Sequence, residues 1–149
     1  MSGVVVTALG AAFGYLQLRG PKAKLSFEVF GRGIIRDGLP VHDGPLLLVS
    51  IVNTGGVVVS IDRIELHRYR TTIDRLMGRP AKVHGCEDPS IRGQNARDAL
   101  PYELQPGQRW VGTARFDEDM LKEFRRGEYW FAIHTASRKW PHLRHIPRS

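Results

Sequence analysis

The order of apolar and polar positions along the chain predicts a protein made mainly of β-strands. Its centre is the stretch 45–69, in which an apolar run at 46–52 and a second at 57–61 flank the sequence Asn-Thr-Gly-Gly at 53–56. Val, Ile and Leu on both sides predict two buried strands, and the Asn and Gly residues predict a tight hairpin turn with positive φ. Apolar and polar residues then alternate over 63–67, so the second strand is expected to continue with one face in water.

Further strands are predicted on both sides of this centre. Residues 31–44 are predicted to be a glycine-broken connection, and Pro106 with Gly107 marks a turn. A short helix is expected at 117–126, because Asp117 is a good N-cap and Gly127 a good residue to follow the helix. The predicted strands are 25–30, a short edge strand at 34–35, 110–116, 128–135 and a last strand that begins at 139.

The segment 71–99 is expected to be a long loop that contains one helical turn at 72–77. Its residues are polar and rich in turn formers, and no apolar period runs through it. Loops of this length are uncommon in compact domains and are usually functional or mobile. A recognition loop is therefore expected here.

The first 18 residues contain no charged side chain, and Arg19, Lys22 and Lys24 follow at once. As a helix the segment would span about 27 Å, close to the thickness of the hydrocarbon layer. Charges after the apolar run are typical of an uncleaved anchor with a cytoplasmic basic flank, whereas a signal peptide carries its charges before the run. The valines at 4–6 and several glycines favour the alternative of a strand or an arm packed on another subunit.

The side chains of this segment expected to contact lipid or a partner subunit are Val4, Val5, Val6, Leu9, Gly10, Phe13, Gly14 and Leu16. Gly10 and Gly14 have the G-x-x-x-G spacing that lets two membrane helices approach closely. These residues would make the contacts whether the segment is a membrane anchor or an arm packed on another subunit.

Composition narrows the function without deciding it. At 149 residues, with 42% hydrophobic and 25% charged residues, the chain is long enough for one domain with a substantial core. A net charge of +7 suits nucleic acid, anionic lipid or an acidic protein face, although the basic residues are scattered. The single Cys86 excludes an internal disulfide and favours a reducing compartment.

Three stretches share a recognisable pattern. Residues 51–61 fit V-x-N-x-G-x-x-x-V-x-I apart from Ile at the first position, residues 100–107 fit L-P-x-x-L-x-P-G, and residues 136–140 form a small-residue turn before an aromatic. Together, over about 25–140, they resemble a loose group of prokaryotic and phage Ig-like, or fibronectin-III-like, sandwich domains. The resemblance implies an antiparallel β-sandwich, often preceded by a membrane helix and basic residues, and it implies no activity.

The sequence predicts no enzyme, no metal site and no cofactor. His142 with His145 and His84 with Cys86 are close pairs, but zinc needs three or four converging ligands and neither pair has a partner at standard spacing. These histidines are therefore predicted to be ordinary surface residues. No Ser lies in a nucleophile-elbow context, and the acidic residues at 117–119 are explained by a helix start.

A basic contact patch is predicted at Arg125, Arg126, Arg138, Lys139 and Trp140. Trp140 stands beside two cations and is the tryptophan expected to be exposed, whereas Trp110 and Trp130 are expected in the core or on a sheet face. No continuous basic stripe with interleaved aromatics is visible, so nucleic acid is not expected as a partner.

The sequence thus predicts an Ig-like antiparallel β-sandwich at 24–141 with one short helix, an apolar N-terminal helix or arm at 1–19, and a basic tail at 142–149. We expect a non-enzymatic interaction module, tethered to a membrane with its domain in the cytoplasm, which binds protein partners or itself. The alternative is a structural component of a larger assembly such as a phage virion, in which the N-terminal segment is an inter-subunit arm.

Overall fold

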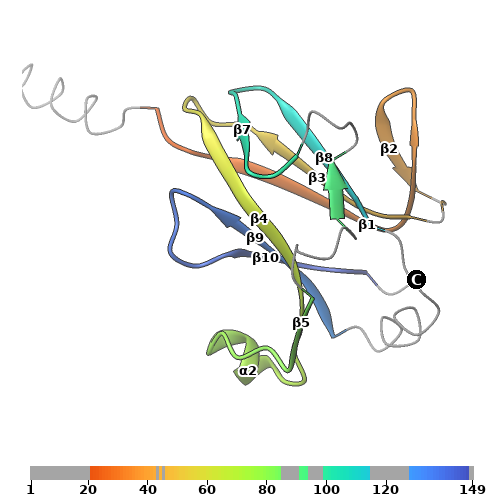
Figure 1. The fold of residues 1–149 in the computed structure, drawn as a ribbon, viewed down its shortest axis with the longest axis vertical. Coiled ribbons are helices and arrows are strands. Elements are labelled where there is room, and N and C mark those ends of the chain that lie inside the picture. Colours follow the sequence, from red (N-terminus) through yellow and green to blue (C-terminus); the bar gives the residue numbers. More distant parts are fainter. Residues whose placement is uncertain are drawn as a thin grey trace, which may run out of the picture.

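The protein is a β-sandwich of two antiparallel sheets (Figure 1). The structure, a computed structural model, describes residues 21–42, 44, 46–84, 91–93, 99–114 and 128–147. In chain order the elements are β1 (Leu25–Arg36), β2 (Leu39–His42), β3 (Leu46–Asn53), β4 (Val59–Arg68), α2 (Thr72–Leu76), β5 (Lys82–His84), β6 (Ile91–Gly93), β7 (Tyr102–Leu104), β8 (Arg109–Ala114), β9 (Tyr129–Thr135) and β10 (His142–His145).

The first sheet has the strand order β2-β1-β3-β8-β6, and the second has the order β10-β9-β4-β5, with β7 also paired to β4. Strands β3 and β8 supply one wall of the core, and β4 and β9 supply the other. Alternate residues of each strand point inward, between the two sheets. The largest fully buried side chains are Trp110, Tyr129, Phe131, Leu47, Leu48, Ile51, Ile61, Ile64, Leu66, Leu104, Ile133 and Val49. The prediction of a mainly β chain folded as an antiparallel sandwich is confirmed.

The predicted central hairpin is wrong. Strand β3 pairs with β1 and β8, whereas β4 pairs with β5, β7 and β9, so the two apolar runs lie in different sheets. The residues between them form a crossover from one sheet to the other. The prediction of positive φ at 53–56 is also wrong, since the described residues with positive φ are Asp37, Gly38, Gly78 and Gly107.

Asn53 holds this crossover together, and its side chain is fully buried. The amide nitrogen Nδ2 donates to the carbonyl oxygens of Val57, at 2.7 Å, and Leu104, at 2.9 Å. The amide oxygen Oδ1 accepts a hydrogen bond of 3.0 Å from the backbone N–H of Gly55. The backbone of Asn53 also donates to Gln108 and accepts from Gly107.

The two glycines of the crossover are explained by close backbone approach. Gly55 donates its N–H to the Lys24 oxygen at 3.1 Å, and Gly56 donates to the Lys22 oxygen at 3.2 Å. A Cβ at Gly55 would collide with the backbone of Lys22 and Lys24, and one at Gly56 would lie 2.7 Å from Cβ of Pro21. The N-terminal approach to β1 is therefore bonded directly to the crossover.

The stretch 31–44, predicted to be an irregular connection, contains a β-hairpin. Strand β1 continues to Arg36 and pairs with β2, so residues 34–35 are the end of a long strand. Asp37 (φ 52°) and Gly38 (φ 77°) form the two-residue turn, in agreement with the preference of Asp-Gly for turns that need positive φ at both positions. Strand β2 forms the edge of the first sheet.

The predicted loop 71–99 contains regular structure in the part that is described: α2, β5 and β6. In Figure 1, α2 and β5 extend beyond the sandwich at the bottom of the view. The last strand does not begin at 139 as expected, because β10 lies at His142–His145, within the stretch predicted to be a basic tail.

Several predictions fall outside the described residues: the segment 1–19, the helix at 117–126 and Cys86. The helix that is described is α2. Within the described ranges, no helix combines the length and the apolar character needed to cross a membrane.

Candidate functional site

The second sheet carries helix α2 at the end of β4, and the sequence around this helix explains both of its ends. The Oγ1 atom of Thr71 accepts a hydrogen bond of 3.1 Å from the backbone N–H of Asp74, which is an N-cap contact. At the other end Gly78 donates to Arg75 and Arg79 donates to Asp74. These two bonds, with Gly78 at a φ of 64°, form a Schellman motif that ends the helix.

A groove with a volume of about 430 Å³ lies between α2 and the turn that leads into β10. The ring of Trp140 lies against the end of the helix, since a Cβ added at Gly78 would be 3.4 Å from its Cζ3 atom. Tyr69 and Leu143 also line the groove, as does Arg75. The residues that line it are Tyr69, Arg75, Leu76, Met77, Gly78, Trp140, Pro141 and Leu143.

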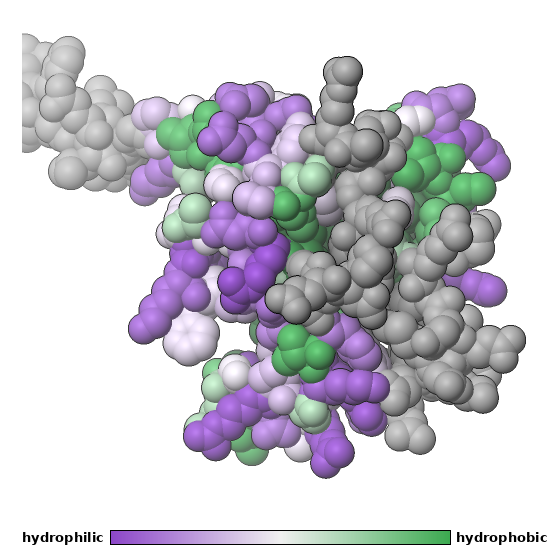
Figure 2. All heavy atoms as spheres, viewed as in Figure 1, coloured by the Kyte–Doolittle hydropathy of each residue, from purple (hydrophilic) through white to green (hydrophobic). Residues whose placement is uncertain are grey.

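Exposed apolar side chains line the groove and continue along α2. The side chains of Leu76 (79% exposed), Ile73 (68%), Trp140 (63%) and Met77 (54%) are far more exposed than is usual for residues of their size. Figure 2 shows hydrophobic and hydrophilic residues interleaved over α2, at the bottom of the view. Grouped apolar exposure of this kind marks interaction surfaces in soluble proteins.

A second exposed apolar group lies on the hairpin formed by β1 and β2, at the edge of the first sheet. Its members are Ile34 (38% exposed), Leu39 (56%) and Val41 (37%). These side chains stand on the edge hairpin of the first sheet, whereas those beside α2 adjoin a groove. We therefore regard the groove beside α2 as the better candidate site.

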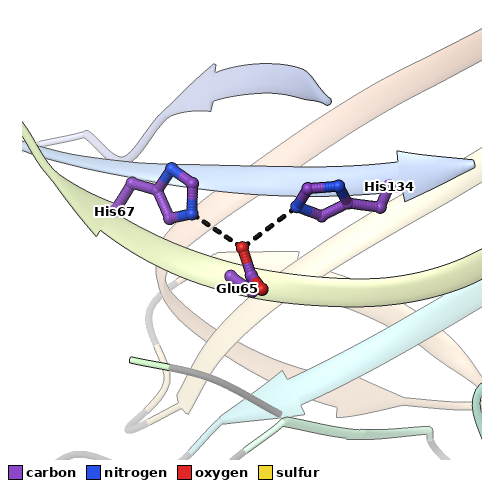
Figure 3. Close-up of side chains that lie close together, drawn as sticks. All are labelled: Glu65, His67 and His134. Atoms are coloured by element: carbon purple, nitrogen blue, oxygen red, sulfur yellow. Dashed lines mark hydrogen bonds and ion pairs between the residues drawn. The ribbon is translucent and has the colours of Figure 1, made fainter. Parts of the chain in front are cut away.

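The outer face of the second sheet continues from this groove into a polar cluster. Glu65 and His67 lie on β4, and His134 lies on β9 (Figure 3). The Oε2 atom of Glu65 is 2.8 Å from Nε2 of His67 and 3.0 Å from Nε2 of His134. The second carboxylate oxygen, Oε1, accepts a hydrogen bond of 3.0 Å from Nε of Arg63.

The strand register brings these side chains together. Residues two apart on a strand point to the same face, which places Glu65 and His67 side by side. In the ladder between β4 and β9, Glu65 is paired with Ala132 and Arg63 with His134. The small side chain of Ala132 leaves room for the carboxylate to reach the neighbouring His134.

Electrostatics keep Glu65 ionised. Burial raises the pKa of this carboxyl group, but hydrogen bonds from His67, His134 and Arg63 outweigh burial, so its pKa lies below 4.5. The pKa of Tyr69 is raised above 10.0, first by burial and then by the negative charge of Glu65. The cluster is thus an ionised carboxylate held by three side chains.

Tyr69 joins the cluster to the groove. Its hydroxyl lies 3.0 Å from Nδ1 of His67, while the tyrosine also lines the groove. Beside it, the guanidinium of Arg75 stacks over the ring of Trp130 at 4.2 Å from the ring centroid. Helix α2 is thereby packed against β9 through a cation–π contact.

The predicted basic patch is only partly described. Arg138, Lys139 and Trp140 are all exposed in the turn between β9 and β10, and Nζ of Lys139 lies 5.9 Å from the centroid of the Trp140 ring. Arg125 and Arg126 lie outside the described residues, as do all the positions named in the N-terminal segment. Whether the patch makes contacts with a partner stays a prediction.

The tryptophans and histidines are placed as follows. Trp110 is buried in the core, and Trp130 lies on the outer sheet face under Arg75, as expected. His142 and His145 do not converge, because His142 contacts the ring of Phe27 and His145 that of Trp130 on the opposite sheet face.

The sequence did not predict the cluster of Glu65, His67 and His134. His134, on β9, follows His67 by 67 residues and Glu65 by 69 residues in the chain. These side chains are therefore close only because of the register between β4 and β9. The one local signal is the spacing of Glu65 and His67, which places a carboxylate and an imidazole on the same face of a strand.

Comparison with known proteins adds no family to this description. A scan against protein-family models, a search of curated proteins and a search of solved structures each found no match.

Proposed function

We propose that the chain is a non-enzymatic interaction module built on an Ig-like sandwich, and that its contact surface is the groove between α2 and Trp140. The proposal includes the tether to a membrane by the N-terminal segment, which rests on the sequence alone. The single observation that carries it is the group of exposed apolar side chains around a concave site.

The order of the strands supports an Ig-like grouping. Strands β1, β3 and β8 in one sheet face β10, β9 and β4 in the other. In an Ig-like domain the A, B and E strands face the G, F and C strands in the same chain order, with B to C and E to F crossing between the sheets. The crossover at Asn53 corresponds to the B to C connection.

The groove favours a protein partner with an apolar anchor. A concavity of about 430 Å³ is at the small end of ligand sites and suits one or two side chains of a partner segment. Trp140 lies on its wall and is 63% exposed, and tryptophan is among the residues most enriched at the energetic centres of interfaces.

Charge at the rim favours an acidic partner. Arg75 lines the groove and Lys139 lies beside Trp140, while Arg70 and Arg79 are exposed next to the groove residues Tyr69 and Gly78. Asp74 is the acidic residue of α2. We therefore commit to a partner segment in which acidic residues flank one or two large apolar side chains, because complementary charge speeds and orients such an encounter.

The test uses two labelled peptides with the same central Phe-Leu pair, flanked by Glu residues in one and by Lys residues in the other. Fluorescence anisotropy at about 50 mM salt, where screening is weak, measures their affinities for the full chain. We expect the Glu-flanked peptide to bind at least about 10-fold more tightly. The variant Trp140→Ala should weaken this binding by about 10-fold or more, because it removes the exposed anchor.

Leu39→Ala is the matched control, since Leu39 is an exposed apolar residue on the distant β2 edge. It should bind the peptide as the parent does. Equal binding of both peptides, or an equal loss in Leu39→Ala and Trp140→Ala, would overturn the assignment of the groove. Binding to vesicles of anionic lipid without binding to either peptide would overturn the choice of a protein partner.

A further inference from the structure

We propose that Glu65, His67 and His134 form a binding site for a divalent transition-metal ion, with Zn²⁺ as its representative. The ligand atoms are Oε2 of Glu65 and the Nε2 atoms of both histidines. Two imidazoles and a carboxylate are a donor set that suits zinc and its neighbours in the first transition row. The three ligand residues do not line the groove, and the proposal does not depend on the function proposed for the groove.

The three side chains already converge on one point. Their ligand atoms all lie within 4.8 Å of one another, and both histidines direct Nε2 at the same carboxylate oxygen (Figure 3). In a tetrahedral zinc site, metal–ligand distances near 2.1 Å place ligand atoms about 3.4 Å apart. The two oxygen–nitrogen separations of 2.8 and 3.0 Å would have to open by about 0.4–0.6 Å, and the two histidine nitrogens, which lie within 4.8 Å of each other, would have to settle at the same spacing.

Two further groups orient the ligands from behind. The hydroxyl of Tyr69 lies 3.0 Å from Nδ1 of His67, and Arg63 holds the other oxygen of Glu65 at 3.0 Å. Partners of this kind, placed on the second nitrogen of a histidine and on the second oxygen of a carboxylate, fix the orientation of metal ligands.

The tyrosine hydroxyl suits both states of the site. Without a metal ion, a neutral His67 protonated on Nε2 donates to Glu65, and its Nδ1 accepts from the Tyr69 hydroxyl. With an ion at Nε2, the proton of a neutral imidazole resides on Nδ1 and is donated to the Tyr69 oxygen. The ion thus exchanges one hydrogen-bonded arrangement for another without leaving a buried polar atom unpaired.

The position of the cluster allows an ion to enter. The side chains of Glu65 and His134 are each 17% exposed, and that of His67 is 9% exposed. All three stand on paired strands of the second sheet, so their backbones are fixed by the ladder. Three protein ligands leave a fourth position, which solvent can fill, as in open zinc sites.

The experiment measures Zn²⁺ binding to the full chain, prepared without a polyhistidine tag, by titration calorimetry. We expect saturable binding of one ion per chain at concentrations below about 100 µM. His134→Gln should weaken binding by more than about 100-fold, and Tyr69→Phe by about 10-fold, the usual range for an outer partner of a ligand.

His145→Gln is the matched control, because His145 is an exposed histidine on the same sheet face. It should bind Zn²⁺ as the parent does and give the same visible spectrum with Co²⁺, which reports a four-coordinate site. His134 is partly exposed, so His134→Gln should keep the circular dichroism spectrum of the parent. No saturable binding at about 100 µM Zn²⁺ would overturn the proposal and leave a hydrogen-bonded network only. Unchanged binding in His134→Gln, or a loss in His145→Gln, would also overturn it.

Discussion

Replacement of Asn53 tests whether the crossover between the sheets depends on one side chain. Asn53→Ala removes a buried hydrogen bond to the Leu104 oxygen and two partly buried bonds, one to the Val57 oxygen and one from the Gly55 N–H, which keeps the Lys24 oxygen as its other acceptor. A buried group left without a partner costs about 1–3 kcal/mol, and each partly buried bond is worth about 0.5–1.5 kcal/mol. We therefore expect the free energy of unfolding to fall by about 4 kcal/mol.

Urea denaturation followed by far-ultraviolet circular dichroism measures this loss. With an m-value of about 2 kcal/mol/M, typical of small proteins, the midpoint should fall by about 2 M urea. Thr54→Ala is the matched control, because Thr54 is exposed and its hydroxyl makes only a long contact of 3.4 Å with the Lys24 oxygen. It should change the free energy of unfolding by no more than about 0.5 kcal/mol.

Asn53→Asp sharpens the test. The carboxylate keeps an acceptor for Gly55 but turns an oxygen, in place of the donor Nδ2, towards the carbonyl groups of Val57 and Leu104. It should destabilise the fold at neutral pH at least as much as Ala does, and recover part of the loss in acid, because a protonated carboxyl can donate again. A loss of less than about 1 kcal/mol in Asn53→Ala, or equal losses at positions 53 and 54, would refute the role assigned to Asn53.

Other predictions test the core, the pH response and the N-terminus. Ile51→Ala and Val59→Ala should each lower the free energy of unfolding, by about 2–5 kcal/mol for Ile and somewhat less for Val, and melting within a degree or two of the parent would contradict this. The pKa of His142 is lowered from 6.5 to about 4 by burial and by the charges of Arg138 and Arg144. The unfolded chain therefore takes up this proton first, and the contribution of His142 to stability, complete above about pH 7, is lost as the pH falls towards 4. We expect about 1–2 kcal/mol after solvent screening, measured as the parent minus His142→Gln difference at pH 4.5 and pH 7, and a difference independent of pH would contradict it. Deletion of residues 1–18 should release the chain from membranes on fractionation; if the full chain is soluble in high salt without detergent the anchor is excluded, and loss of incorporation into a complex on deletion would favour the inter-subunit arm.

Apolar patterning predicted the five longest of the described strands, β1, β3, β4, β8 and β9, because it depends on burial, which the sequence records directly, and it missed the shorter ones. The runs at 46–52 and 57–61 do form β3 and the start of β4, and their buried residues were correctly assigned to the core. Pairing was not predictable in the same way. A short Asn-Thr-Gly-Gly segment between two apolar runs suits a hairpin and a crossover equally, and only the long-range bonds of Asn53 to Leu104 and to residues 107–108 distinguish them.

Two of the three stretches that carried the resemblance are bonded to each other. Leu104 and Gly107 belong to the L-P-x-x-L-x-P-G stretch, and both contact Asn53 of the N-x-G stretch. The sequence showed that both stretches were present but not that they meet.

The candidate sites were harder to predict. The groove depends on how α2 packs against Trp140, and the polar cluster depends on the register of β9 against β4. Trp140 was identified by its basic neighbours, whereas the apolar residues of α2 were hidden in a segment without clear periodicity. His134 was one of six histidines and had no local signal.

The bonds between residues 22–24 and the crossover have a mechanical consequence. Any pull transmitted through the chain before residue 21 reaches three backbone hydrogen bonds, from Thr54, Gly55 and Gly56, before it reaches the ladder between β1 and β3. A pull along β1 would shear that ladder, so that many bonds resist at once, whereas a pull across it would open the bonds one after another from Lys22. Because Asn53 is also bonded to Leu104 in the opposite sheet, the force would be shared by both layers of the sandwich at its point of entry.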